Sequence, residues 1–160
     1  MDIFEYAMQM EKDGENFYRR IASQTNSAAI KAVMNMLADE EVKHYRAIEQ
    51  IAKDRYEMAE TDILNDAKNV FIQMKDKKEE FTSNQEQVEL YRKAQEIEKQ
   101  SQQFYTEQAN RMDKEELRKL FEQLAKEEEK HYFLLENIID FVLRPEHWLE
   151  NAEWYHLDKY

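Results

Sequence analysis

The sequence predicts an all-α protein built from four long helices. Its 160 residues include one Gly and one Pro, which leaves almost no turn punctuation, and alternating runs of β-branched residues are absent. Residues 1–51 and 88–138 align without a gap as two copies of one helix pair, 87 residues apart. A single domain is expected at this length (1–160), and the chain is long enough to bury a core.

The first predicted helix covers residues 2–23. Its apolar stripe recurs at steps of three and four residues, through Phe4, Ala7, Gly14, Tyr18 and Ile21. Glu11 falls in the middle of this stripe. An ionised carboxylate at such a position is costly to bury unless it is paired or coordinated.

The second predicted helix covers residues 28–55 and follows a polar turn in which Ser27 or Asn26 is expected to be the N-cap. Its buried face consists of six apolar residues: Ile30, Val33, Met34, Leu37, Ile48 and Ile51. Glu41 and His44 interrupt this face at its centre, so two further polar groups fall among core positions.

Residues 56–82 have no copy in the second half of the chain. Their apolar residues predict irregular and helical structure in a crossover: Ile63, Leu64, Val70, Phe71, Met74 and Phe81. Such a crossover is expected if the third long helix runs antiparallel to a helix other than the second.

The third long helix is predicted to open at the capping box Ser83-x-x-Glu86 and to run to about Met112. Glu98 shares one face of this helix with four other residues: Tyr91, Ala94, Tyr105 and Gln108. The second copy therefore repeats the first, with an acidic residue inside an otherwise core-facing stripe.

The fourth long helix is predicted to begin near Asp113-x-x-Glu116 and to end before Pro145, which lacks an amide hydrogen and clashes with the preceding turn. Its core face consists of Leu117, Leu120, Phe121, Leu124, Leu135, Ile138 and Val142. Glu128 and His131 interrupt that face, as Glu41 and His44 do in the first copy.

The C-terminal segment 146–158 suits a short amphipathic fifth helix. Its apolar residues are Trp148, Leu149, Ala152, Tyr155 and Leu157, and this helix is expected to pack over the bundle or over a partner subunit. His147 and His156 lack a Glu three residues earlier, so they are interpreted as surface or packing residues.

Six side chains of the repeat form a candidate two-metal site: Glu11, Glu41, His44, Glu98, Glu128 and His131. In both copies the second Glu follows the first by thirty residues, and the His follows it by three. Residues at i and i+3 share a helix face, so each pair can reach one cavity. Two divalent cations balance four carboxylates, and an empty site is expected to raise the carboxylate pKa values.

Imidazole combined with oxygen ligands suits iron, with manganese or zinc as alternatives. Glu41 and Glu128 are expected to bridge the two ions, and Glu11 and Glu98 to terminate one ion each. A single Glu-x-x-His in so acidic a chain would be accidental, and it is the recurrence that indicates a site. The neighbouring Glu40, Glu127 and Glu129 are expected to be solvated.

Tyr18 and Tyr105 follow Glu11 and Glu98 by seven residues, which returns nearly to the same helix face. One interpretation is a pair of core tyrosines whose hydroxyls find some acceptor. The other is a pair of catalytic candidates that donate hydrogen bonds to ligand carboxylates. The two interpretations are compatible.

The composition excludes several classes of function. A formal charge of −12 argues against nucleic acid and anionic membranes as partners. The absence of cysteine excludes disulfides, a thiol nucleophile, Cys-bound zinc and iron–sulfur ligation. The charged start, MDIFEYAMQMEKDG, lacks the apolar run of a signal peptide, and no stretch approaches the ~20 apolar residues of a membrane span. A cytoplasmic location is therefore expected.

The motifs EKDGENFY with DEEVKHY, and EKQSQQFY with KEEEKHY, resemble those of the ferritin-like di-iron carboxylate superfamily, in particular rubrerythrin-type proteins. The resemblance implies a ferritin-like four-helix bundle, a homodimer and a di-iron site that reacts with hydrogen peroxide or dioxygen. It also implies the six residues above as metal ligands, with Glu41 and Glu128 as the bridging pair.

Two departures from the family pattern affect the expected chemistry. Rubrerythrins often append a Cys-ligated rubredoxin domain, and this chain has no cysteine, so any electron donor, such as a donor protein, must be a separate molecule. Many also carry a further carboxylate one turn after the third-helix Glu. Here Ser101 takes that place, and Gly14 takes the matching place in the first copy. Redox-linked ligand exchange at that position is therefore not expected.

Three functional hypotheses follow from these observations. The first is a di-iron oxidoreductase that acts on peroxide or dioxygen, and the second is a non-catalytic protein that binds or handles iron. Sustained turnover with peroxide and a donor protein separates these two. The third is a helical interaction module with a structural di-metal site, which would keep its fold but lose its partner when the metal is removed.

Overall fold

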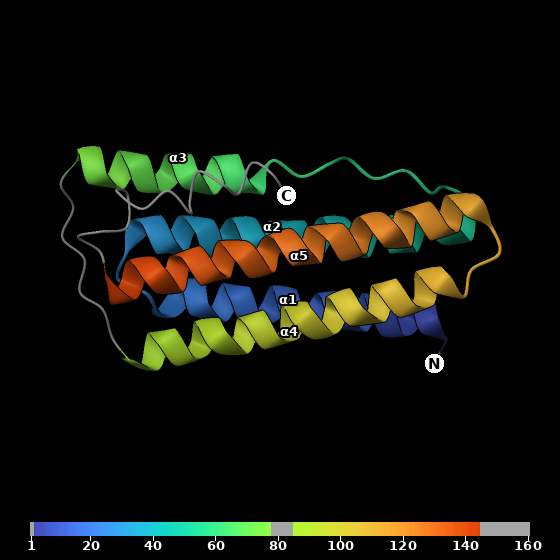
Figure 1. The fold of residues 1–160 in the computed structure, drawn as a ribbon, viewed down its shortest axis with the longest axis horizontal. Helices are drawn as coiled ribbons and strands as arrows, with labels where there is room; N and C mark the ends of the chain where they lie inside the picture. Colours follow the sequence, from blue (N-terminus) through green and yellow to red (C-terminus); the bar gives the residue numbers. More distant parts are fainter. Residues whose placement is uncertain (1, 78–84, 145–160) are drawn as a thin grey trace.

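The computed structural model describes residues 2–77 and 85–144, and these form a helical bundle (Figure 1). Its elements are α1 (Ile3–Gln24), α2 (Ala28–Gln50), the short 3-10 helix η1 (Ile51–Lys53), α3 (Ile63–Asp76), α4 (Gln85–Asn110) and α5 (Glu115–Leu143). No strand occurs in the described part of the chain. The predicted all-α, ferritin-like four-helix bundle is confirmed, with α1, α2, α4 and α5 as its long helices.

The two helices of the first copy begin at well-defined caps. The Asp2 carboxylate accepts a hydrogen bond from the Glu5 amide at 2.8 Å, and the Ser27 hydroxyl accepts one from the Ile30 amide at 3.2 Å. Ser27 is therefore the N-cap of α2, one of the two predicted alternatives. The second helix ends earlier than predicted, because Asp54 adopts a left-handed conformation (φ 55°) that turns the chain away.

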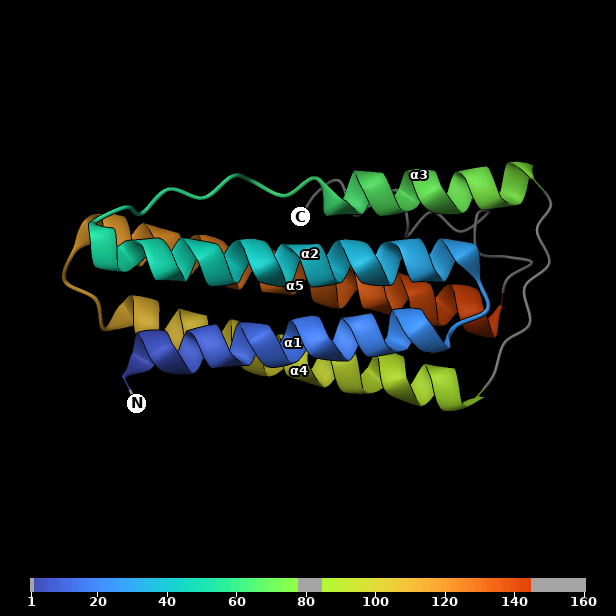
Figure 2. The same cartoon turned by 180° about the vertical axis from the view of Figure 1, so that it is seen from behind.

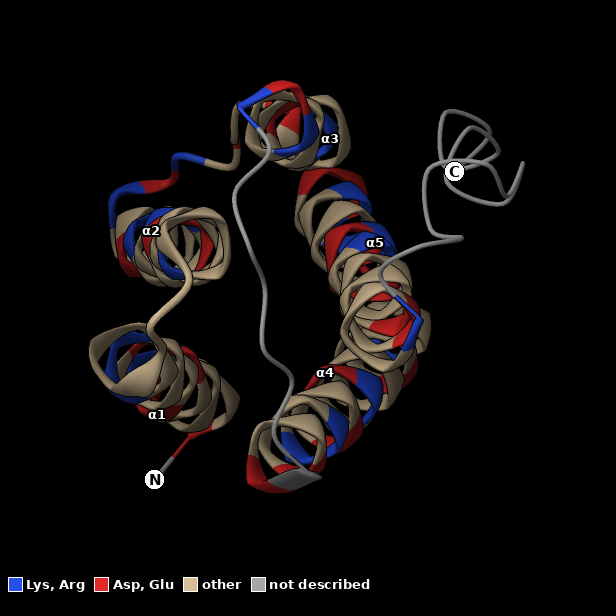
Figure 3. Ribbon diagram, turned by 90° about the vertical axis from the view of Figure 1, so that its left-hand side faces the viewer, with Lys and Arg blue, Asp and Glu red and all other residues tan. Residues whose placement is uncertain are grey.

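The chain between α2 and α4 crosses the bundle. Residues 55–62 run without regular secondary structure back along α2, and α3 then lies against α2 and α5 (Figures 1 and 2). As a result α4 runs antiparallel to α1 and parallel to α2, as the predicted crossover requires. The view along the bundle in Figure 3 places α3 beside the α2 and α5 edge.

The second helix of the second copy, α5, begins one residue later than its sequence signal predicts. Lys114, which makes no side-chain capping bond, occupies the N-cap of α5, so the expected start at Asp113 was wrong by one residue. The capping box at Ser83, the stop at Pro145 and the helix predicted for 146–158, with His147 and His156, lie outside the described residues. None of the described helices is long and apolar enough to cross a membrane.

Two apolar clusters fill the bundle, one on each side of a polar layer. One cluster contains residues of α3, and its members include Leu37, Phe71 and Leu134. The other cluster includes Ala7, Ile48 and Tyr105. Along α2 the order is Leu37 and Ala38, then Glu41 and His44, then Ala47 and Ile48. Hydrophobic burial on both sides therefore holds the polar layer in the centre of the protein.

Candidate metal centre

All four long helices contribute to the polar layer. The structure brings together every residue of the predicted set, each at most 4% exposed: Glu11, Glu41, His44, Glu98, Glu128 and His131. They fall into two groups whose ligand atoms lie within 4.8 Å of one another: Glu11, Glu41, His44 and Glu128, and Glu41, Glu98, Glu128 and His131. Glu41 and Glu128 belong to both groups, which is the placement expected of bridging carboxylates.

Both histidines turn the same ring nitrogen toward the carboxylates. His44 Nδ1 lies 2.8 Å from Glu128 Oε1 and 3.4 Å from Glu11 Oε1. His131 Nδ1 lies 3.5 Å from Glu98 Oε1 and 3.6 Å from Glu41 Oε1. The imidazole rings stack at 5.6 Å with an interplanar angle of 11°. Two Nδ1 atoms and four carboxylates thus converge on one small volume.

Several buried oxygens of this layer have no hydrogen-bond partner among the described residues. They include Glu11 Oε2, Glu41 Oε1 and Glu98 Oε2. A buried polar atom without a partner is destabilising, and three carboxylate oxygens in one layer add to that cost. A donor set of carboxylate oxygens and imidazole nitrogens suits divalent transition metals. The residues present therefore fit a pair of metal ions.

The pKa values of the two shared carboxylates are raised well above their usual range. Burial is the main cause for Glu41, followed by the negative charges of Glu11 and Glu128. Burial is also the main cause for Glu128, followed by the charges of Glu98 and Glu11. The expected rise of carboxylate pKa in an empty site holds for this pair.

The other two carboxylates shift in the opposite direction, so the expectation is wrong for them. Burial alone would raise the pKa of Glu98, but the charge of His131 and the hydrogen bonds with Glu128, His131 and Tyr18 together lower that pKa to about 2. Burial would likewise raise the pKa of Glu11, but the charge of His44 and the hydrogen bonds with Glu41, His44 and Tyr105 together lower it. Burial lowers and Glu98 raises the pKa of His131, with a net value of about 9. The pKa of His44 is also raised, because the lowering effect of burial is outweighed by Glu11, Glu127 and Glu128 together.

The two tyrosines donate to carboxylates of the opposite copy. The Tyr18 hydroxyl on α1 donates to Glu98 on α4, and the Tyr105 hydroxyl on α4 donates to Glu11 at 2.5 Å. Both tyrosines are also fully packed core residues, at most 1% exposed. Both sequence interpretations therefore apply to their geometry, while a catalytic role stays a prediction.

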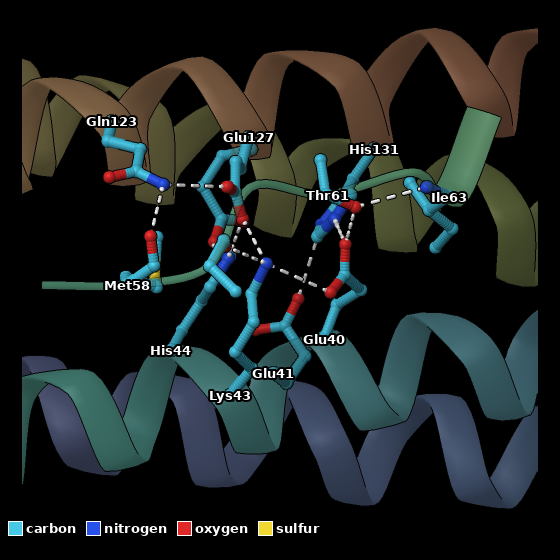
Figure 4. Close-up of polar contacts among 12 residues, drawn as sticks. Glu40, Glu41, Lys43, His44, Met58, Thr61, Ile63, Gln123, Glu127 and His131 are labelled. Carbon is cyan, nitrogen blue, oxygen red and sulfur yellow. Dashed lines mark hydrogen bonds and ion pairs between the residues drawn. The ribbon is translucent and has the colours of Figure 1, made fainter. Parts of the chain in front are cut away.

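The expectation that Glu127 is solvated was wrong. Its side chain is buried, and His44 Nε2 lies 2.9 Å from Glu127 Oε1 (Figure 4). Because His44 Nδ1 faces the carboxylate layer, the Nε2–H donates to Glu127. Glu40 is half-buried, with Oε1 3.6 Å from His131 Nε2, and Glu129 is half-buried too. The identity of Glu40 and Glu127 in the two copies was a signal that sequence reasoning missed.

Gly14 lies directly against a predicted ligand. A Cβ atom at this position would come within 3.0 Å of Glu41 Oε2. The missing side chain therefore allows α1 to pass close to the Glu41 carboxylate. Its counterpart Ser101 is buried, so neither copy supplies a further carboxylate here.

A surface groove of about 790 Å³ between α1 and α2 reaches the layer from outside. Glu11 and Glu41 contribute to its floor, and Arg19 and Asp39 form an ion pair of 2.7 Å across it. Its remaining lining residues are Lys12, Glu15, Val42, Lys43, Tyr45 and Arg46. A small polar molecule or ion therefore has a short path to the first copy's carboxylates.

Comparisons with known proteins bear on both the fold and the sequence motifs. The chain is similar in structure to a hypothetical protein from Pyrococcus furiosus, with a TM-score of 0.66, 20% identity, and coverage of 91% of this chain and 90% of that one. At this identity the likeness shows the fold alone. A comparison with curated proteins found no match. The rubrerythrin family model matches residues 2–139, which include both copies of the motif, and the chain therefore belongs to the rubrerythrin family.

Proposed function

We propose that this protein is a di-iron carboxylate oxidoreductase that reduces hydrogen peroxide or dioxygen. The observation that carries the proposal is the pair of overlapping ligand groups that share Glu41 and Glu128. Membership of the rubrerythrin family supports iron as the metal, although the same donor atoms accept manganese or zinc. When bound, a pair of ferrous ions supplies the two electrons that convert one peroxide molecule, with two protons, into two water molecules.

The side chains of this protein would bind and orient the reacting groups. Tyr18 and Tyr105 hold one oxygen each of Glu98 and Glu11, which leaves the second oxygen of each carboxylate for the metal. The two apolar clusters shield the layer from bulk water on its two sides along the bundle. The groove between α1 and α2 offers a small oxidant an approach to Glu11 and Glu41.

Electrons must return to the site from another molecule. The chain has no cysteine and so cannot carry a Cys-ligated iron centre of its own. A separate electron-donor protein is therefore part of the proposal, as is a homodimeric assembly. The net negative charge of this chain disfavours nucleic acid and anionic membranes as partners.

Iron handling without sustained turnover is the second candidate. It is favoured by Gly14 and Ser101, because neither can supply the mobile carboxylate that many rubrerythrins place there. Under this alternative the site would load and oxidise iron once, but would not cycle with an external reductant.

The test begins with anaerobic iron reconstitution and metal analysis, for which about two ions per chain are expected. Absorption spectra before and after one equivalent of peroxide then measure single-turnover oxidation. Steady-state peroxide consumption with a rubredoxin-like donor measures cycling, which we expect to be slow. Oxidation without cycling would favour iron handling. No oxidation by peroxide or dioxygen would remove the oxidoreductase proposal.

A Ser101→Glu variant identifies what limits cycling. It restores a carboxylate one turn after Glu98, so turnover should increase if ligand supply is limiting. Ser101→Gln is the matched control of similar size without the charge. Equal turnover in the parent and both variants would place the limit in electron delivery.

A further inference from the structure

The two site histidines differ at their outer nitrogens, although the sequence around them is repeated. His44 Nε2 is hydrogen-bonded to Glu127 at 2.9 Å. The equivalent contact of His131 is longer, since its Nε2 lies 3.6 Å from Glu40 Oε1 and makes no hydrogen bond of ordinary length among the described residues. Both histidines are fully buried.

The cause of the difference is a segment of the crossover, residues 58–61, which we term the strap. The strap passes over the outer side of both histidines (Figure 4). The Thr61 hydroxyl donates to Glu40 Oε1, the same oxygen that faces His131. The competing contact therefore holds Glu40 just out of reach of His131.

The strap acts in the opposite sense on Glu127. Gln123 Nε2 donates both to the Met58 carbonyl, at 3.2 Å, and to Glu127 Oε2, at 3.3 Å. Lys43 Nζ bonds the Ala59 carbonyl at 3.0 Å and pairs with Glu127 Oε1 at 2.9 Å. These contacts hold Glu127 against His44 (Figure 4).

We propose that the strap makes the two halves of the metal site inequivalent, with Glu127 as a positioning residue that strengthens the half held by His44. A carboxylate that accepts the outer N–H of a ligating imidazole fixes the tautomer and ring orientation and raises ligand basicity. His44 has this support at 2.9 Å, whereas the equivalent contact of His131 is 3.6 Å long. The ligand pattern occurs twice in the chain, but the crossover that contains the strap occurs once. The strap therefore makes different contacts with the two halves of the site. The inference rests on the proposed metal site.

The test is a stepwise anaerobic titration with Co²⁺, followed by visible absorption. The parent should bind two ions in two resolved steps. Glu127→Gln keeps the size of the side chain but removes its charge, and it should weaken the tighter step by about tenfold or more. Glu40→Gln, the equivalent change in the other copy, should leave the tighter step unchanged. Equal effects of the two variants on both steps would overturn the proposal.

Thr61→Val tests the strap itself. The variant frees Glu40 to reach His131, so the weaker step should become tighter and approach the stronger one. No change in the weaker step would show that Thr61 does not hold Glu40 away. Circular dichroism and thermal unfolding of the cobalt-free proteins identify any variant that has lost its fold.

A spectroscopic measurement distinguishes positioning from a general loss of stability. Protein loaded with ⁵⁷Fe²⁺ should give two Mössbauer quadrupole doublets, and Glu127→Gln should shift one of them. Binding of fewer than two ions by the parent would contradict the proposed metal site. Two ions with identical affinities and one doublet would contradict only the inequivalence of the halves.

Discussion

The α1–α2 half and the α4–α5 half of this protein carry the same six-residue pattern in different surroundings. Their tyrosines are reciprocal, since Tyr18 donates to Glu98 and Tyr105 donates to Glu11. The contacts of the outer histidine nitrogens are not reciprocal, because among the described residues His44 Nε2 lies 2.9 Å from Glu127 whereas His131 Nε2 lies 3.6 Å from Glu40. The comparison teaches that duplication preserves the groups that face inward, whereas the unduplicated crossover determines what surrounds them.

The largest effect on metal binding is expected from Glu41 and Glu128, which belong to both ligand groups. Replacing both Glu41 and Glu128 by Ala removes the two carboxylates common to both ligand groups, so iron content should fall from about two ions per chain to near zero. Metal analysis after reconstitution measures this. Replacing both Glu40 and Glu127 by Ala should cause a smaller loss, through His44. Equal losses in the two double variants would show that the shared carboxylates have no special role.

The second prediction concerns pH, because protons replace metal in the empty site. Raised pKa values of Glu41 and Glu128 stabilise the fold below the ordinary Glu value of 4.5, and this stability is lost as pH rises through the raised values. His131 has the same sign, and its contribution is lost between 6.5 and about 9. Glu98 has the opposite sign, and its contribution is lost as pH falls from 4.5 to about 2.

The metal-free protein should therefore be most stable in mild acid and lose stability as pH rises toward about 9. Metal should reverse the trend above mild acid, because it binds the deprotonated ligands and stabilises the folded state by mass action. Thermal unfolding across this range, with and without metal, is the measurement. Parallel curves for the two forms would contradict a shared, desolvated carboxylate layer.

The tyrosines provide a test of equality between the halves. Tyr18→Phe and Tyr105→Phe each remove one hydrogen bond to a buried carboxylate, and each should lower the free energy of unfolding of the metal-loaded protein by about 2 kcal/mol. Urea unfolding of both variants measures this. Tyr91→Phe is a control, because the Tyr91 hydroxyl has no hydrogen-bond partner among the described residues. A clear difference between the first two variants would mean that the inner groups are as asymmetric as the outer ones.

The smallest effect is expected from a substitution at Gly14, which should stabilise the metal-free protein but weaken metal binding. Gly14→Ala gains up to about 1 kcal/mol of helix propensity in the metal-free protein. Its new methyl group would press on Glu41 Oε2, so metal affinity should decrease. Ser101→Ala in the other copy adds no bulk and should leave affinity nearly unchanged. Measuring the free energy of unfolding without metal and the Co²⁺ affinity of the same variants tests whether the two effects have opposite signs. A simultaneous rise in both quantities would contradict the steric account.

Local periodicity explains how much the sequence could predict. Glu11 and Glu98 interrupt apolar stripes of period 3.6, and Glu41 and His44 share a face at i and i+3. A helix turns these spacings into directions, so the inward-facing set could be named before any tertiary contact was known. Ser27 as a cap depends on equally local geometry.

Other features depended on contacts between segments distant in the sequence. Glu127 lies one residue outside the predicted core face, and it is held in its buried position by Gln123 and Lys43, which also bond the strap. Tyr18 could have met several acceptors, and the packing of α1 against α4 selected Glu98. The sequence by itself determined which side chains face the centre, because that is a property of each helix. The tertiary structure alone decided which partner each one meets, because helix packing and the path of an irregular crossover follow no repeat.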